Sequence, residues 1–136
     1  MLISVTEERT REVIDPAAEI VSIKKIVEDI CTRLNDLALD MQTGKDARAA
    51  QSIQAFTGAA EKLLRIIHQL EIQGYLESAE ESIKSIISEF GKLIKDFLDA
   101  YERHDTVLVG DIAEYEASVK LQELYDSVLN TVQERK

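Results

Sequence analysis

The sequence is poor in the residues that make turns, crosslinks and membrane spans. It contains one proline, five glycines, one cysteine and no tryptophan. Few glycines and prolines argue against a turn-rich β fold. A single cysteine, Cys31, cannot form a disulfide within the chain. No apolar run approaches the roughly 20 residues of a membrane-spanning helix, and the N-terminus lacks the pattern of a secretory signal. We therefore expect a soluble, cytoplasmic protein.

Positive charge is also in short supply. Lysine and arginine number 16 against 26 aspartates and glutamates, which gives a formal net charge of −10. Binding to phosphate groups needs clustered Lys and Arg, so an acidic surface repels nucleic acids and anionic lipids. We expect no nucleic-acid partner and no membrane insertion.

The residue patterns of common active sites are absent as well. A di-iron helical bundle needs Glu-x-x-His, but Arg65 stands three residues before His68, and Tyr101 three before His104. The chain has no His-Glu-x-x-His, no paired cysteines, no Gly-rich phosphate loop and no nucleophile elbow. We therefore expect a protein without enzymatic activity, metal or cofactor. Cys31, beside the predicted core, is interpreted as a small boundary hydrophobe.

What the sequence does contain is helix-forming residues in amphipathic order. Apolar residues recur three and four positions apart, the spacing that lines one face of a helix. Asp15-Pro16 favours a helix start, Gly44 and Gly74 favour helix ends, and Asp105 or Thr106 can cap the last helix. The predicted helices cover residues 16–41, 47–73, 77–103 and 107–133.

Four helices of similar length joined by short turns predict an all-α, antiparallel up-down-up-down four-helix bundle. A chain of 136 residues has room for one such domain, which we place at residues 16–136. Residues 1–15 begin with a short apolar stretch and continue as a charged run, so we expect a mobile N-terminal arm.

The last helix has a less regular pattern than the others. Leu108, Ile112, Tyr115 and Val119 form one stripe, and a second, slightly rotated stripe follows after a shift near Lys120. The second stripe comprises Leu121, Tyr125, Val128 and Val132. Because Val107, Leu108 and Val109 are consecutive, at least one of them should point away from the core.

Two stretches are candidate partner-binding sites. The first is a face of small residues in the second helix, with Ala50, Thr57 and Gly58. The second mixes apolar and acidic residues, a combination that suits a partner helix that is both apolar and basic. Its residues are Val107, Val109, Asp111, Glu114 and Tyr115. For both stretches, packing within the chain is the competing interpretation.

The acidic all-helical plan, together with Glu123-Leu124-Tyr125-Asp126 before an apolar turn, resembles the small helical export chaperones of bacterial flagella. This resemblance implies a bacterial adaptor or chaperone-like bundle that holds a helical segment of another protein. It assigns no site residues. The alternatives are a self-associating structural bundle, in which the same faces form a homodimer, and a bundle that binds a small molecule or a metal.

Overall fold

The computed structural model describes residues 15–134, and every regular element in that range is helical. This confirms the all-α class. Most of the predicted arm, residues 1–14, lies outside the described residues. The elements are α2 (Pro16–Ser22), α3 (Lys24–Gln42), α4 (Asp46–Ile72), the short 3₁₀ helix η1 (Glu77–Ala79), α5 (Glu80–Glu102), α6 (Thr106–Ile112), the π-helical turn η2 (Ala113–Ala117) and α7 (Ser118–Glu134).

Three connections end helices with a residue in the left-handed conformation. Gly44 and Gly74 have φ values of 76° and 78°, and His104 takes the same role with φ of 57°. Glycine adopts this conformation without strain, which is why it commonly ends helices. The Asp105 carboxylate accepts a hydrogen bond of 3.1 Å from the Leu108 N–H, so the predicted cap of the last helix is confirmed.

The first predicted helix, over residues 16–41, is divided at Ile23 into α2 and α3. The Ser22 hydroxyl donates to the Glu19 carbonyl at 2.8 Å, a local bond of the type that bends helices. The buried Tyr125 hydroxyl donates to the Ile20 carbonyl at 2.7 Å and so satisfies one of the last carbonyls of α2. Helix α2 packs against both α4 and α7.

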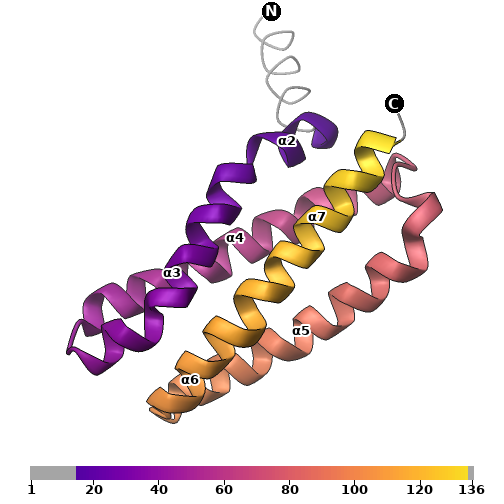
Figure 1. Cartoon of the computed structure of the whole chain (residues 1–136). Coiled ribbons are helices and arrows are strands. Elements are labelled where there is room, and N and C mark those ends of the chain that lie inside the picture. Colours follow the sequence, from indigo (N-terminus) through magenta and orange to yellow (C-terminus); the bar gives the residue numbers. More distant parts are fainter. Residues whose placement is uncertain (1–14, 135–136) are drawn as a thin grey trace, which may run out of the picture.

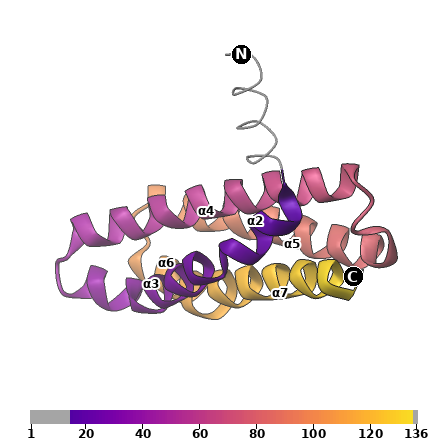
Figure 2. The ribbon, with the colours of Figure 1, turned by 90° about the horizontal axis from the view of Figure 1, so that it is seen from above.

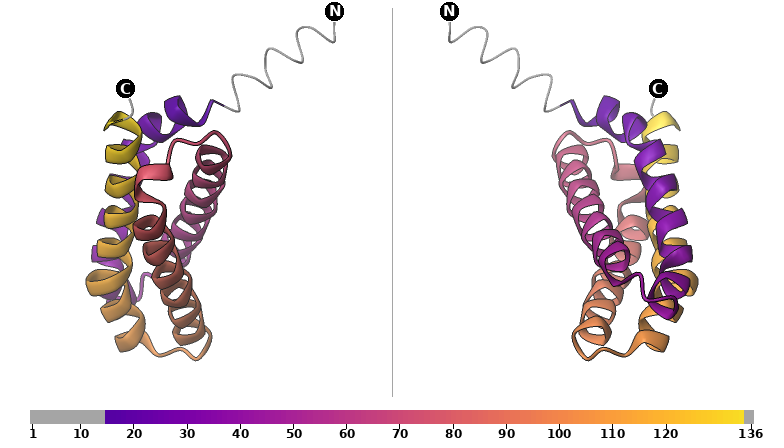
Figure 3. Two further views of the ribbon diagram at one scale, coloured as in Figure 1. Left: turned by 90° about the vertical axis from the view of Figure 1, so that its right-hand side faces the viewer. Right: turned by 90° about the vertical axis from the view of Figure 1, so that its left-hand side faces the viewer.

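The chain follows α3 to one end of the molecule, returns along α4, runs back along α5 and returns again through α6, η2 and α7 (Figure 1). Helix α3 packs against α4 on one side and against α6, η2 and α7 on the other, while α5 packs against the same three elements. Figures 2 and 3 show α3 and α7 side by side, with α4 and α5 on the other side of the molecule.

Aromatic side chains connect α4 with α5 in the centre. The Phe56 ring meets Phe90 and Phe97 edge-to-face, with centroid distances of 6.0 and 5.6 Å. All three rings are fully buried. Such pairs add about 0.5–1.5 kcal/mol to the stabilisation from burial alone, so they strengthen the contact between α4 and α5.

The π turn changes which face of the last segment is buried. The predicted first stripe is wrong at three of its four residues, because Leu108, Tyr115 and Val119 are exposed. A π turn takes up one residue more than an α turn, so the buried face steps from Ala113 to Ala117. The buried apolar side chains of this segment are Val109, Ile112, Ala113, Ala117, Leu121, Leu124, Tyr125, Val128 and Val132.

Helix α6 lies unusually close to α3. A Cβ atom placed on Gly110 would stand 2.7 Å from the Cβ of Ala38, which is closer than side chains tolerate. Gly110 is also buried. Its missing side chain is therefore a packing requirement of the α3–α6 crossing.

Candidate functional site

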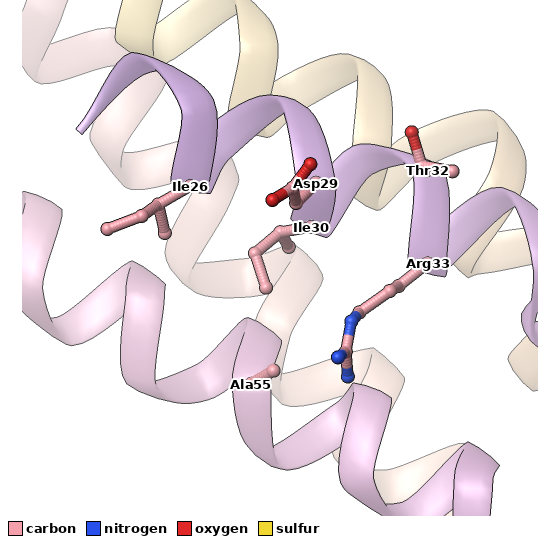
Figure 4. A pocket seen from close by; sticks show the side chains of 6 residues that line it. All are labelled: Ile26, Asp29, Ile30, Thr32, Arg33 and Ala55. Atoms are coloured by element: carbon pink, nitrogen blue, oxygen red, sulfur yellow. The ribbon is translucent and has the colours of Figure 1, made fainter.

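The small-residue face of α4 is divided between two environments. Ala55 faces α3, where it lines an open hollow of about 440 Å³ with Ile26 and Ile30 (Figure 4). On other sides of α4, Ala50 and Thr57 are half-buried, and the Thr57 hydroxyl donates to the Gln54 carbonyl at 3.0 Å. Gly58 is exposed, with nothing within 4 Å of a Cβ placed on it. Part of this face thus serves packing within the chain.

The hollow in Figure 4 has an aliphatic floor and a polar edge. Ile26, Ile30 and Ala55 form the floor, and Arg33 extends from α3 toward α4. Asp29, at the edge, forms an ion pair of 3.6 Å with Lys25. No residue that lines the hollow is a histidine or a cysteine, and its polar side chains do not converge on one point.

The segment from α6 to α7 carries the most exposed group of large apolar side chains. Val107 is 71% exposed, Tyr115 68% and Val119 56%, and Leu108 lies just above one third. The exposure of Val107 confirms the prediction that at least one of Val107, Leu108 and Val109 points away from the core. We call Val107, Tyr115 and Val119 the apolar patch.

The prediction that Val109 belongs to a partner-binding surface is wrong. Its side chain is fully buried, because it lies on the face of α6 that packs against α3 and α5. Asp111 and Glu114 are exposed, as is Glu116. These carboxylates alternate along the chain with the side chains of the apolar patch.

A groove between α3 and α7 adjoins the patch. It has a volume of about 420 Å³ and shares Val119 with the patch; we call it the α3–α7 groove. Its lining residues are Cys31, Asn35, Ser118, Val119, Gln122 and Glu123. Asn35, Ser118 and Gln122 could not be predicted from the sequence, because isolated polar residues at helix positions form no pattern.

Cys31 is held at the groove by its neighbours on α7. The thiol lies 3.4 Å from the Ser118 carbonyl and 3.7 Å from the Gln122 side-chain oxygen, and donates to both. Burial, and then the charges of Asp126 and Glu28, raise the pKa of the Cys31 thiol from 9.0 to about 11. A thiol with this pKa is a poor nucleophile at neutral pH, in line with the interpretation of Cys31 as a boundary residue.

The two histidines lie apart from any cluster of ligands. His68 is exposed on α4, and His104 occupies the left-handed position after α5. Within residues 15–134, no three His, Cys, Asp or Glu side chains come together in a way that could hold a metal ion. No helix in the same range is long and apolar enough to cross a membrane.

A further hollow, of about 380 Å³, is lined by residues around the α3–α4 turn and the α5–α6 turn. Its polar residues are Asp46, Tyr101, Glu102, His104 and Thr106. None of the hydrogen bonds or ion pairs among the described residues joins two of these side chains.

The fold and these surfaces define an all-helical protein with an exposed apolar patch beside a groove. The chain matches a family described as a domain of unknown function (DUF8042) over residues 19–127, and it belongs to that family. An uncharacterized protein of Treponema pallidum (strain Nichols) is 28% identical over 106 residues, which cover 71% of this chain and 50% of the relative. The chain thus spans about half the length of that relative. No solved structure matches the chain significantly.

Proposed function

We propose that this protein is a non-catalytic, protein-binding adaptor or chaperone-like bundle. The observation that supports the proposal best is the apolar patch, since Val107, Tyr115 and Val119 of the α6–η2–α7 segment are all more than half exposed. Exposed apolar groups that lie together with a polar rim are typical of protein-interaction sites, whereas single exposed apolar residues are not. The acidic rim of Asp111, Glu114 and Glu116 completes that description.

The proposal includes an architecture, an antiparallel up-down-up-down four-helix bundle with a mobile N-terminal arm. The course of α3, α4, α5 and α6–η2–α7 in Figure 1 supports the four-helix part. Bundles of this kind present rigid helix faces to partners. The cellular setting that fits is the bacterial cytoplasm, with flagellar export as one process that uses such bundles.

Affinity capture with matched variants tests the proposal. The full-length protein, Val119→Asp and Ile72→Asp are immobilised and exposed to native lysate, and bound proteins are quantified. Ile72 is 65% exposed at the end of α4, far from the patch in the chain, so its variant makes the same chemical change elsewhere. We expect a stoichiometric partner that binds the full-length protein and Ile72→Asp but not Val119→Asp.

Either of two outcomes would contradict the proposal. One is the absence of any stoichiometric partner, and the other is equal recovery by both variants, which would place the contact away from the patch. A substitution at an exposed position changes the free energy of unfolding by only about ±0.5 kcal/mol. Both variants therefore stay folded, and a difference in recovery reports on binding.

The second candidate is a self-associating bundle in which the apolar patch forms a homodimer. The exposed Tyr115 and Val119 favour it, since a two-fold contact would cover both patches at once. Light scattering at high micromolar concentration tests it: a dimer that Val119→Asp converts to a monomer supports the homodimer, and a monomeric full-length protein removes it.

A further inference from the structure

The break between α2 and α3 interrupts the backbone hydrogen bonds of the helix. The series stops with the Ile23 N–H, which donates to the Glu19 carbonyl at 3.2 Å, and resumes with the Val27 N–H, which donates to the Ile23 carbonyl at 3.0 Å. Among the described residues, no N–H of α3 donates to a carbonyl of α2. The N–H groups of residues 24–26 therefore lack the bonds that a continuous helix would give them. Figure 3 shows α2 turned away from the axis of α3.

Nothing in the local sequence requires this break. Sharp bends in helices occur at proline, at glycine or where a side chain enters the series of backbone hydrogen bonds. Residues 19–27 contain neither proline nor glycine. The side chain that enters is Tyr125, whose hydroxyl donates at 2.7 Å to the Ile20 carbonyl. In a continuous helix that carbonyl would accept from the Lys24 N–H, so the bend results from a contact distant in the sequence.

Few interactions hold α2 in its bent position. Of its seven residues, only Pro16 and Ile20 are buried. Helix α2 packs against α4 and α7. Within residues 15–134, the Tyr125 bond to Ile20 is the one side-chain hydrogen bond that joins α2 to another helix. Release of α2 would thus break few contacts and would leave the contacts among α3, α4, α5 and α7 in place.

The interactions gained and lost at the break largely offset each other. The bent form buries Ile20 and gains the Tyr125 hydrogen bond, but it gives up three backbone hydrogen bonds. A straight form would regain the three bonds and lose the burial of Ile20. Because the net contribution of one hydrogen bond is smaller than that of one fully buried isoleucine, neither side outweighs the other by much. A segment balanced in this way has two accessible arrangements.

We propose that α2 is a hinged lid with two arrangements, the bent form described above and a straight form in which residues 16–42 make one helix. Straightening lifts α2 from α4 and α7, transfers the Ile20 carbonyl from the Tyr125 hydroxyl to the Lys24 N–H, and uncovers that hydroxyl. The hinge thereby controls which surface α7 presents at this end of the molecule. The inference goes beyond the proposed protein binding, because neither Ile20 nor Tyr125 belongs to the apolar patch.

Amide hydrogen exchange of the full-length protein, followed by NMR, distinguishes the two forms. In the bent form the amides of residues 24–26 have no acceptor in the helix, and in the straight form they are protected. Ile20→Gln combined with Tyr125→Phe removes both the buried side chain and the hydrogen bond, while glutamine still favours helix. We expect these three amides to exchange about tenfold more slowly in this variant, which corresponds to a straight form populated about ten to one.

Milder variants avoid the change at a fully buried position. Tyr125→Phe removes only the hydrogen bond, and Ser22→Ala removes a hydroxyl that bonds locally and bends the helix. Each should move the Cα chemical shift of Ile23 toward helical values. In the bent form Ile23 has φ of −91° and ψ of 6°, whereas a continuous helix has values near −63° and −42°.

Thr32→Ala is the matched control for Ser22→Ala. It removes a hydroxyl that donates to the Glu28 carbonyl at 3.2 Å within α3, where the helix is continuous. We expect it to leave exchange at residues 24–26 and the Ile23 chemical shift unchanged.

Two results would overturn the inference. One is loss of protection at residues 19–23 while residues 24–26 still exchange fast, which would show that α2 unfolds instead of straightening. The other is unchanged exchange at residues 24–26 in the double variant. If the double variant unfolds as a whole, the milder variants decide, and an Ile23 chemical shift that stays constant in both Tyr125→Phe and Ser22→Ala overturns the inference.

Discussion

Helix α5 and the α6–η2–α7 segment pack against each other, yet they differ in how many of their large apolar side chains are exposed. Helix α5 keeps Ile83, Phe90 and Phe97 on one buried face, and none of its large apolar side chains is exposed. The α6–η2–α7 segment exposes four of them, of which Val107 and Tyr115 are the most accessible. The two neighbours therefore differ in how much apolar surface they leave for another molecule.

The π turn at Ala113–Ala117 accounts for much of this difference. Helix α5 repeats without interruption, so its three-four spacing stays in register with the core over its whole length. In the α6–η2–α7 segment, the additional residue of the π turn shifts the buried face, so that the side chains of Tyr115 and Val119 are exposed to solvent. Because π turns occur often at functional sites, the interruption itself points to the exposed side of this segment.

Deleting one residue from each segment gives the largest expected contrast. Removing Lys92 from α5 rotates everything after it by about 100°, which takes Leu93 and Phe97 out of the core. Removing Glu114 instead converts the π turn into an α turn and keeps both flanking faces in register. We expect Lys92 deletion to abolish the cooperative thermal transition followed by circular dichroism.

For the Glu114 deletion, we expect the midpoint to stay within roughly 5 °C, equivalent to about 1 kcal/mol. Equal loss of the transition in both deletions would show that the π turn is required for packing and does more than accommodate an additional residue.

A smaller contrast comes from two glycines. Gly110→Ala places a Cβ at 2.7 Å from the Cβ of Ala38 and should destabilise the protein by about 1–3 kcal/mol. Gly91→Ala, on the exposed side of α5, meets nothing within 4 Å and should stabilise it by about 0.5–1 kcal/mol. Urea unfolding measures both.

The double variant Gly110→Ala/Ala38→Gly serves as the control, because it returns space at the α3–α6 crossing. Partial recovery of stability would confirm the close approach of α3 and α6. No difference between Gly110→Ala and Gly91→Ala would contradict it.

A third contrast compares two tyrosines of the same segment. Tyr125→Phe removes the hydrogen bond to the Ile20 carbonyl, and we expect a loss of about 1–2 kcal/mol, since a buried carbonyl is left unsatisfied. Tyr115→Phe, at an exposed position, should change stability by less than about 0.5 kcal/mol. Hydrogen exchange would place the effect of Tyr125→Phe at α2, and uniform exchange across the molecule would argue against a local role.

The helices that repeat regularly could be predicted from the sequence. Both predicted ends of α4 and the predicted C-terminal end of α5 agree with the structure to within one residue, because Gly44, Gly74 and Asp105 mark turns whose chemistry is local. The predicted start at residue 77 is wrong by three residues, since residues 77–79 form the 3₁₀ helix η1 and α5 begins at Glu80. The break at Ile23 could not be predicted. Ile23 fits the apolar spacing, and the bond that Tyr125 makes to Ile20 joins residues distant in the sequence.

The candidate site was predicted in part. The pattern of the last helix showed that the buried face rotates, but it placed the shift near Lys120, since Tyr115 and Val119 are apolar and fit an inward stripe. Val109 was assigned to the surface because nothing local shows that Gly110 brings α6 against α3. Whether an apolar residue is buried depends on its neighbours in space, which spacing does not report.

The smallest expected effect concerns ionisation at Cys31. Its pKa of about 11, against an ordinary 9.0, means that the unfolded thiol ionises first as the pH rises. The stability linked to this thiol is complete below pH 9.0 and is lost as the pH rises to about 11. At neutral pH, iodoacetamide should modify the folded protein about a hundredfold more slowly than the unfolded chain, as the thiolate fractions require.

Glu28→Gln and Asp126→Asn should each speed this modification in the folded protein, because each removes a charge that raises the pKa of the Cys31 thiol. Glu61→Gln, on the exposed side of α4, is the matched control and should leave the rate unchanged. Alkylation rates measured against pH for the three variants would show whether the charges of Glu28 and Asp126 act on the Cys31 thiol. If Glu28→Gln and Asp126→Asn matched Glu61→Gln, burial alone would account for the raised pKa of the Cys31 thiol.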